Sequence, residues 1–324
     1  MSNLEADPVE FDCLPKTSAG VEILEPRDVP LGGPRAMRVR RTLPQRRRSL
    51  VGAWCFADHY GPETLHNRPG MDVPPHPHTG LQTVSWLFAG LIEHRDSNGV
   101  HAMVHPGELN LMTAGAGICH SEVSRVSGPS AGVLHGVQLW VALPDSARHT
   151  DRAFDHYAPA PVRHSGATLR VFLGALGGQV SPVVTHTPLL GAQIDLPVGA
   201  SVELEIDRDF EHGLLLDQGA VEMSGVAVRA RELAYRGAGS GTLALANTGA
   251  EPVRAVLLGG TPFGEELLMW WNFVGRSHDE IVEFRSEWQA RSERFGRVDG
   301  YRGAVDWLPA PPLPTTRLKP RRNN

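Results

Sequence analysis

The sequence predicts an all-β protein with two domains of similar size and one short helix near its C-terminal end. Short apolar runs alternate with Gly, Pro, Asp and Asn, and this pattern recurs in both halves of the chain. With 324 residues, the chain exceeds what one hydrophobic core usually organises. Its 35 Gly and 26 Pro residues indicate many turns, which suits strands better than helices.

The strand-rich pattern divides the chain into three parts. In the first half, runs such as GAWCFADHY, LQTVSWLFAG and GVQLWVALP have no helical period and predict an antiparallel barrel or sandwich. The rhythm stops between Pro144 and about Pro161 and then returns in TLRVFLGALG, GTLALANTG and VRAVLLGG. We therefore expect an N-terminal β domain over 1–148, a C-terminal β domain over 149–302 and a Pro-rich, basic tail over 303–324.

One segment near the end of the second domain is helical in pattern. Ser277 to Glu280 has the form of a capping box, in which the Ser oxygen and the Glu carboxylate accept hydrogen bonds from free backbone N–H groups. Ile281, Phe284 and Trp288 follow on one face and predict a helix that lies against a sheet.

Composition excludes several classes of protein. The net charge of -5 argues against a general nucleic-acid binder, and no apolar run is long enough for a membrane span. The acidic N-terminal segment lacks the apolar core of a signal peptide, and the three widely spaced Cys fit neither a disulfide framework nor a thiolate zinc site. We expect a cytoplasmic monomer without membrane or nucleic-acid partners.

Two short sequence motifs predict a buried metal site. Alternate residues of a strand point to the same face, so His76-Pro77-His78 and His120-Ser121-Glu122 each deliver two donors to one side of a sheet. If the two strands face each other in a small barrel, three imidazoles and one carboxylate converge on a divalent ion such as Fe, Ni, Cu, Co, Zn or Mn. The alternative is that these histidines lie on the surface in turns. The second half has no His-x-His word, so we expect no metal there.

The chain resembles the pirins, a family of two-domain cupins. The matching words are DHYGP (58–62), HPHTGLQTV (76–84), LIEHRDSNG (91–99), PGELNLMTAGAGICHSE (106–122) and GVQLWVALP (136–144), with a looser match in GGTPFGEELLMWWNFV (259–274). The resemblance implies two stacked cupin (jelly-roll) β-barrels and one metal, most often iron, held by His76, His78, His120 and Glu122. Many cupins place a liganding Glu where this chain has Gln82, so the resemblance assigns the carboxylate to Glu122.

The resemblance also implies two competing functions. The first is a dioxygenase that cleaves quercetin-like flavonols, in which Glu122 is both ligand and base and the partner is a small aromatic substrate. The second is a metal- or redox-sensing regulator without enzyme activity that binds a partner protein. Isomerase or lyase chemistry is a third possibility, because the fold does not fix the function.

Strand parity predicts a pocket beside the metal. Val84, Trp86 and Phe88 continue the even numbering of His76 and His78, so they point inward if no bulge intervenes. In the alternative reading they are simply barrel core.

We expect structural or local roles for four further groups. We expect His94 to pair locally in a turn, Cys119 to be a packed thiol, and Asp58 with His59 to have at most a supporting role near the metal. A basic cluster is expected to be solvated; its members are Arg40, Arg41, Arg46, Arg47 and Arg48.

Overall fold

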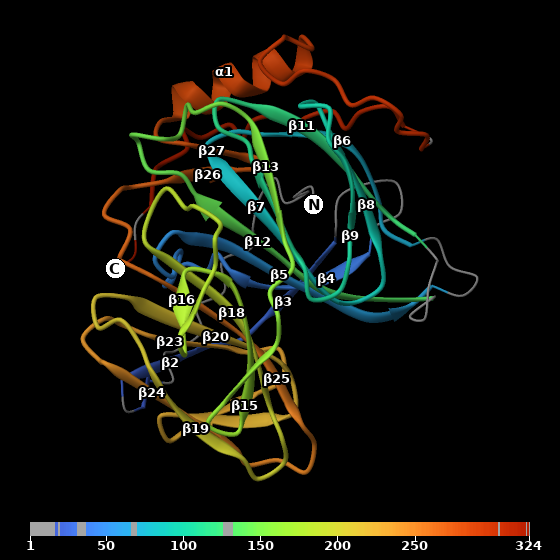
Figure 1. Ribbon diagram of the computed structural model, residues 1–324. Helices are drawn as coiled ribbons and strands as arrows, with labels where there is room; N and C mark the ends of the chain where they lie inside the picture. Colours follow the sequence, from blue (N-terminus) through green and yellow to red (C-terminus); the bar gives the residue numbers. More distant parts are fainter. Residues whose placement is uncertain are drawn as a thin grey trace.

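The computed structural model shows two β-barrels stacked on each other, with the single helix of the described chain on the outer side of the first (Figure 1). The structure describes residues 17–18, 20–30, 37–65, 70–125, 132–303, 305–321 and 323. The predicted acidic N-terminal segment lies outside these residues. Over the described residues, the predicted all-β class with two barrels and a short C-terminal helix is confirmed. No helix in the described ranges is both long and apolar enough to cross a lipid bilayer.

Two antiparallel sheets of the first barrel enclose its interior. The larger has seven strands in the order β13 (Ala153–Tyr157), β10 (Leu109–Thr113), β7 (Leu81–Ala89), β12 (Val133–Ala142), β5 (Trp54–Thr64), β4 (Arg38–Leu43) and β3 (Arg27–Pro30). The smaller has four strands in the order β6 (Asp72–His78), β11 (Ile118–Ser124), β8 (Ile92–Asp96) and β9 (His101–Val104).

The second barrel repeats this plan. Its larger sheet has the order β1 (Thr17–Ser18), β2 (Val21–Leu24), β23 (Leu233–Arg236), β20 (Glu211–Gln218), β25 (Val253–Gly260), β18 (Leu189–Leu196), β15 (Ala167–Leu173) and β14 (Val162–His164). Its smaller sheet has the order β19 (Ser201–Glu205), β24 (Thr242–Asn247), β21 (Ala220–Met223) and β22 (Val226–Arg229). Two short hairpins complete the strands: β16 (Ala175–Leu176) with β17 (Gln179–Val180), and β26 (Leu268–Trp270) with β27 (Phe273–Gly275).

Three segments belong to the barrel that their position in the sequence would not suggest. Strand β2 pairs with β23 of the second barrel, whereas β13 pairs with β10 of the first, although it follows the predicted boundary at residue 148. Hairpin β26–β27 and helix α1 (His278–Gln289) pack on the first barrel. The two barrels therefore exchange their end segments, which ties them together.

Helix α1 forms as the sequence predicts. Its N-cap is Ser277, whose side-chain oxygen accepts a hydrogen bond from the backbone N–H of Glu280 at 3.2 Å. The buried residues of the helix are Ile281, Phe284 and Trp288, which join the core of the first barrel. The predicted apolar stripe is thus the face that covers the small sheet.

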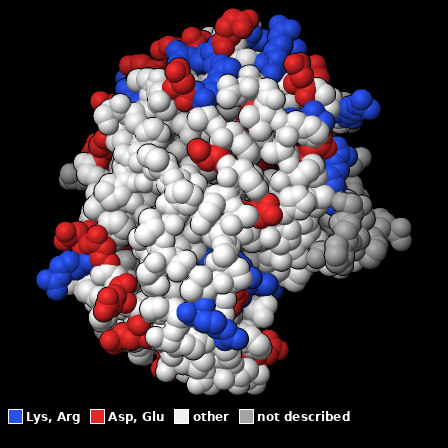
Figure 2. Space-filling model, viewed as in Figure 1, with Lys and Arg blue, Asp and Glu red and all other residues white. Residues whose placement is uncertain are grey.

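The Pro-rich tail continues along the surface as a strap. The backbone N–H of Leu308 donates to the carbonyl of Pro75 at 2.9 Å, and the Trp288 indole N–H donates to the carbonyl of Leu308 at 2.8 Å. Further on, Arg321 pairs with Leu267 through two backbone hydrogen bonds. Charged side chains gather at the end of the molecule where α1 lies, whereas the middle of the visible face is mostly uncharged (Figures 1 and 2).

The two faces of the seven-stranded sheet have different roles. One face lines the interior of the first barrel and looks toward the small sheet, as ring contacts between Trp140 and His78 and between Phe154 and His94 show. The other face packs on the second barrel, where its apolar side chains share one core with residues such as Phe172 and Leu215. The chamber between the two sheets is where the predicted metal donors lie.

Candidate metal centre

Three predicted ligands meet inside the first barrel. Each of His76, His78 and His120 offers one ring nitrogen, and these atoms all lie within 4.8 Å of one another. All three side chains are fully buried, and their ring centroids are 4.3 to 5.1 Å apart. This separation suits three imidazoles around one ion.

Strand register brings the histidines together. His76 on β6 lies directly opposite His120 on β11, and alternation places His78 on the same face of β6. The register shifts between His120 and Glu122, so that Glu122 faces Val73 and β6 carries a bulge there. The bulge turns the Pro74 carbonyl toward His76, where the ring Nδ1–H donates to it at 2.8 Å.

Hydrogen bonds to backbone carbonyls fix the tautomer of two of the three imidazoles. His78 donates from Nδ1 to the carbonyl of Asn272 at 3.0 Å, as His76 does to Pro74. The Nε2 atoms of all three histidines are buried and have no hydrogen-bond partner among the described residues. An unpaired buried polar atom costs about 1–3 kcal/mol, which ligation by a metal would recover. The three lone pairs thus fit a divalent ion.

Burial keeps these imidazoles neutral. It is the main cause that holds the pKa of His76, His78 and His120 well below the ordinary value. A neutral imidazole is the form that binds a metal. The donor set, nitrogen-rich and without thiolates, favours Fe, Ni, Cu, Co or Zn over Ca or Mg.

His94 supports His120 from the next strand. Nδ1 of His120 lies 3.4 Å from Nδ1 of His94, and His94 Nε2 lies 3.0 Å from a carboxylate oxygen of Asp96. If each N–H donates toward Asp96, the Nε2 lone pair of His120 is left free for the ion. The expected local pairing of His94 is therefore only half of its role. The missing signal was the register of β8, which sets Asp96 opposite His120 and His94 opposite Glu122.

Glu122 lies on the same strand face as His120 and is buried. Its carboxylate does not belong to the group of donor atoms that lie within 4.8 Å of one another. The carboxylates of Glu122 and Asp58 add to burial in raising the pKa of Tyr60. Glu122 thus faces the chamber, and its role as the fourth ligand remains a proposal.

The predicted pocket residues lie elsewhere. Val84 and Trp86 belong to the core between the barrels, where Trp86 stacks on Phe172 at 4.5 Å and its indole N–H donates to Gln193 at 2.9 Å. Phe88 packs against the same core and under the guanidinium of Arg254. The prediction that these three side chains line a pocket beside the metal is corrected.

The alternation of β6 does not continue into β7 across the turn Thr79–Gly80. Gly80 has φ of +66°, and the chain passes there from β6 in the small sheet to β7 in the large one. Inward residues of β7 are therefore the odd ones, such as Thr83, which lies opposite Trp140. Alternation holds within one strand and is not carried across such a turn.

A second group of donors lies between the barrels and was not predicted. Oδ1 of Asp217 on β20 lies 2.6 Å from Nε2 of both His59 and His135, and its other oxygen accepts from Nε of Arg254 at 2.6 Å. These separations are those of charge-assisted hydrogen bonds, and the guanidinium opposes a cation there. We name His59, His135, Asp217 and Arg254 the inter-barrel anchor.

Alternation separates the expected pair at 58 and 59. Asp58 faces the chamber and accepts two hydrogen bonds from Arg41, at 2.7 and 2.8 Å, with both side chains buried. His59 points the other way, into the inter-barrel anchor. Neither residue contacts the three histidines through a hydrogen bond that the structure records.

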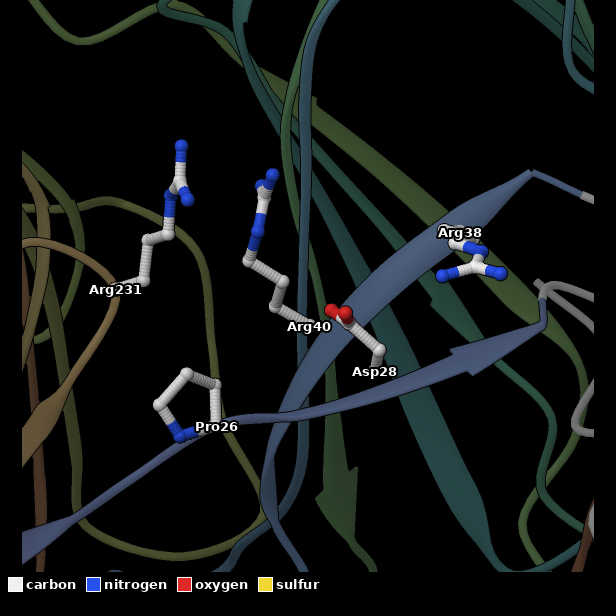
Figure 3. A pocket seen from close by; sticks show the side chains of 5 residues that line it. All are labelled: Pro26, Asp28, Arg38, Arg40 and Arg231. Atoms are coloured by element: carbon white, nitrogen blue, oxygen red, sulfur yellow. The ribbon is translucent and has the colours of Figure 1, made fainter.

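The basic cluster does not act as one solvated patch. Arg41 pairs with Asp58, and Arg48 pairs with Glu22 at 3.1 Å. Arg40 lines a cavity of about 370 Å³ between the barrels, together with Pro26, Asp28, Arg38 and Arg231. Arg40 and Arg231 lie side by side there (Figure 3), and burial followed by repulsion from Arg231 lowers the pKa of Arg40.

Cys119 is a packed thiol, as expected. Alternation turns it away from the histidines into the core beneath α1, where burial raises its pKa.

Comparisons with known proteins show which family and which structures the chain is similar to. The family model described as pirin matches residues 36–141, and the model of the pirin C-terminal cupin domain matches residues 191–296. A Pseudomonas aeruginosa protein named "Putative quercetin 2,3-dioxygenase" is 41% identical over 305 residues, covering 94% of each chain. A Caulobacter vibrioides "Pirin-like protein" is 35% identical over 269 residues, covering 81% of this chain and 91% of its own. A solved structure of quercetin 2,3-dioxygenase from Acinetobacter baumannii superposes with a TM-score of 0.84 at 35% identity, covering 94% of this chain and 98% of its own.

Proposed function

The chain belongs to the pirin family, and from that premise we propose that it is an iron-dependent dioxygenase that cleaves quercetin-like flavonols. The observation that carries the proposal is the convergence of three buried, unpaired Nε2 atoms on one point. The names of the relatives in P. aeruginosa and A. baumannii support a flavonol as the substrate.

We propose His76, His78, His120 and Glu122 as the ligands of one ion. Three imidazoles and one carboxylate would hold the ion from the protein side, and the 3-hydroxy-4-oxo group of a flavonol would supply further oxygen donors. When bound, the iron supplies Lewis acidity and redox chemistry toward dioxygen.

The protein's own groups then perform three tasks. Glu122 accepts the proton of the flavonol 3-hydroxyl, because it is the one carboxylate among the proposed ligands and shares a face of β11 with His120. His94 and Asp96 hold His120 in the orientation that ligation needs. The closed barrel keeps bulk water away from the reacting group, since every proposed ligand is at most 1% exposed.

Metal analysis joined to oxygen uptake tests the proposal. Purified protein should contain one metal per chain, and the iron-loaded protein should consume oxygen with quercetin. His78→Ala should lose both the metal and the activity, whereas His105→Ala, at an exposed position outside the site, should keep both. Stoichiometric iron without oxygen consumption would rule out the dioxygenase.

A further inference from the structure

A continuous row of polar side chains crosses the inner face of the seven-stranded sheet. Successive cross-strand partners on β4, β5, β12, β7, β10 and β13 are all polar, and we name them the polar row: Arg41, Asp58, Gln138, Ser85, Asn110 and His156. Residues directly opposite each other in antiparallel strands share one face. Five of the six are buried, and only His156 reaches the surface.

This face looks onto the metal donors. A second row of cross-strand partners lies next to the polar row, two residues away on each strand. It includes Trp140 and Phe154. The Trp140 ring lies 5.1 Å from the His78 ring, and the Phe154 ring lies 4.9 Å from the His94 ring. No register shift separates Gln138 from Trp140, so both side chains point into the chamber.

The internal hydrogen bonds of the polar row leave donors over. The Ser85 hydroxyl donates to Oε1 of Gln138 at 2.9 Å, and His156 Nδ1 lies 2.9 Å from Oδ1 of Asn110. The amide nitrogens of Gln138 and Asn110 are buried without a partner among the described residues. Buried polar groups are nearly always hydrogen-bonded, so these two amide nitrogens on one face are donors that a bound ligand can satisfy.

A third unpaired donor lies on the same face. Tyr60 follows Asp58 by two residues on β5, and its buried hydroxyl has no partner among the residues that the structure describes. Opposite it stands Gly136, where an added Cβ would come within 3.0 Å of the hydroxyl oxygen. The absence of a side chain at Gly136 therefore leaves room for the Tyr60 hydroxyl inside the chamber.

We propose that Gln138, Asn110 and Tyr60 donate hydrogen bonds to the ring hydroxyl oxygens of a planar substrate. The 3-hydroxy-4-oxo group of the same substrate would bind the metal. This inference rests on the proposed function and names the recognition groups within it. Three unpaired donors match a polyhydroxylated flavonol, and an aromatic without ring hydroxyls would leave them unsatisfied. Gln138, Asn110 and Tyr60 thus select the substrate by its ring hydroxyls, whereas the metal would bind any flavonol.

Two flavonols that differ only in ring hydroxyls separate recognition from ligation. Quercetin carries these hydroxyls, and 3-hydroxyflavone lacks them but keeps the metal-binding group. Affinities are measured by absorbance titration of the nickel-loaded protein without oxygen. We expect the wild type to bind quercetin at least tenfold more tightly than 3-hydroxyflavone, and Gln138→Met to lose about tenfold for quercetin alone, equivalent to about 1.4 kcal/mol.

Gln82→Met is the matched control. Gln82 is equally buried, lies on β7 opposite Thr113 and Val141, and belongs to the outer face of the same sheet. It should keep wild-type affinity for both flavonols and a normal metal content. Asn110→Ser, a smaller change, gives the same test if Gln138→Met does not fold.

The outcomes separate the two claims. Equal wild-type affinity for both flavonols, or equal losses in Gln138→Met, would overturn the role of the polar row and leave the dioxygenase standing. Selective binding of quercetin without oxygen uptake by the iron-loaded protein would uphold the polar row and reject the dioxygenase. A wild type that binds neither flavonol would reject both.

Discussion

Replacing Asp217 with Asn should lower the free energy of unfolding strongly, because Asp217 connects the two barrels. The Asp217 carboxylate is 1% exposed and accepts hydrogen bonds from two imidazoles and from Arg254, all at 2.6 Å. Asn keeps the shape and one acceptor oxygen, but its amide group opposes the Nε–H of Arg254 and the negative charge is lost. Breaking a buried charged pair in this way costs about 3–5 kcal/mol.

Urea unfolding of the full chain, followed by tryptophan fluorescence, measures this loss. The matched control is Asp306→Asn, whose side chain is 79% exposed and lies 3.7 Å from Arg291; surface pairs of this kind contribute about 0–1 kcal/mol. A loss below about 1 kcal/mol in Asp217→Asn would refute the inter-barrel anchor as a stabilising element.

The same carboxylate should make stability depend on pH. Burial alone would raise its pKa, but the N–H groups of His135 and His59 and the charge of Arg254 together hold the pKa of Asp217 far below the ordinary 3.8. A folded pKa below the unfolded one gives stability that is fully present above pH 3.8 and is lost as the pH falls further. Asp217→Asn should therefore remove part of the acid sensitivity below pH 3.8.

Three further predictions follow from other residues. His94→Phe should lower metal affinity about 10- to 100-fold, measured by competition with a chelator, because the support of His120 is lost; an unchanged affinity would contradict this support. Trp86→Phe should destabilise the protein by about 1–2 kcal/mol in urea but leave quercetin affinity unchanged, since Trp86 faces the second barrel; weaker flavonol binding would restore it to the pocket. Burial lowers the pKa of His212 from 6.5 to about 4, so stability should fall by about 3 kcal/mol between pH 6.5 and 4, and His212→Gln should flatten this slope; equal slopes would show that His212 is not responsible.

Local patterns in the sequence were sufficient to predict that the three histidines meet. The i, i+2 spacing in His76-Pro77-His78 depends only on strand alternation, and the structure brings both imidazoles to His120. The capping box at Ser277 is equally local, and α1 begins there. Such features need no knowledge of which strands pair.

Features that depend on pairing could not be predicted. The inward face of β7 changes at Gly80 because the chain moves to another sheet, which reversed the expected positions of Val84, Trp86 and Phe88. His94 joins the site through the register of β8 with β11, and Asp217 meets His59 across 158 residues of chain. The polar row likewise exists only once six strands are aligned.

Anomalous diffraction from crystals of the iron-loaded protein tests the central claim most directly. We expect a single iron peak at about 2.0–2.2 Å from Nε2 of His76, His78 and His120. A peak at His59, His135 and Asp217 instead, or an iron that contacts fewer than three of these imidazoles, would contradict it.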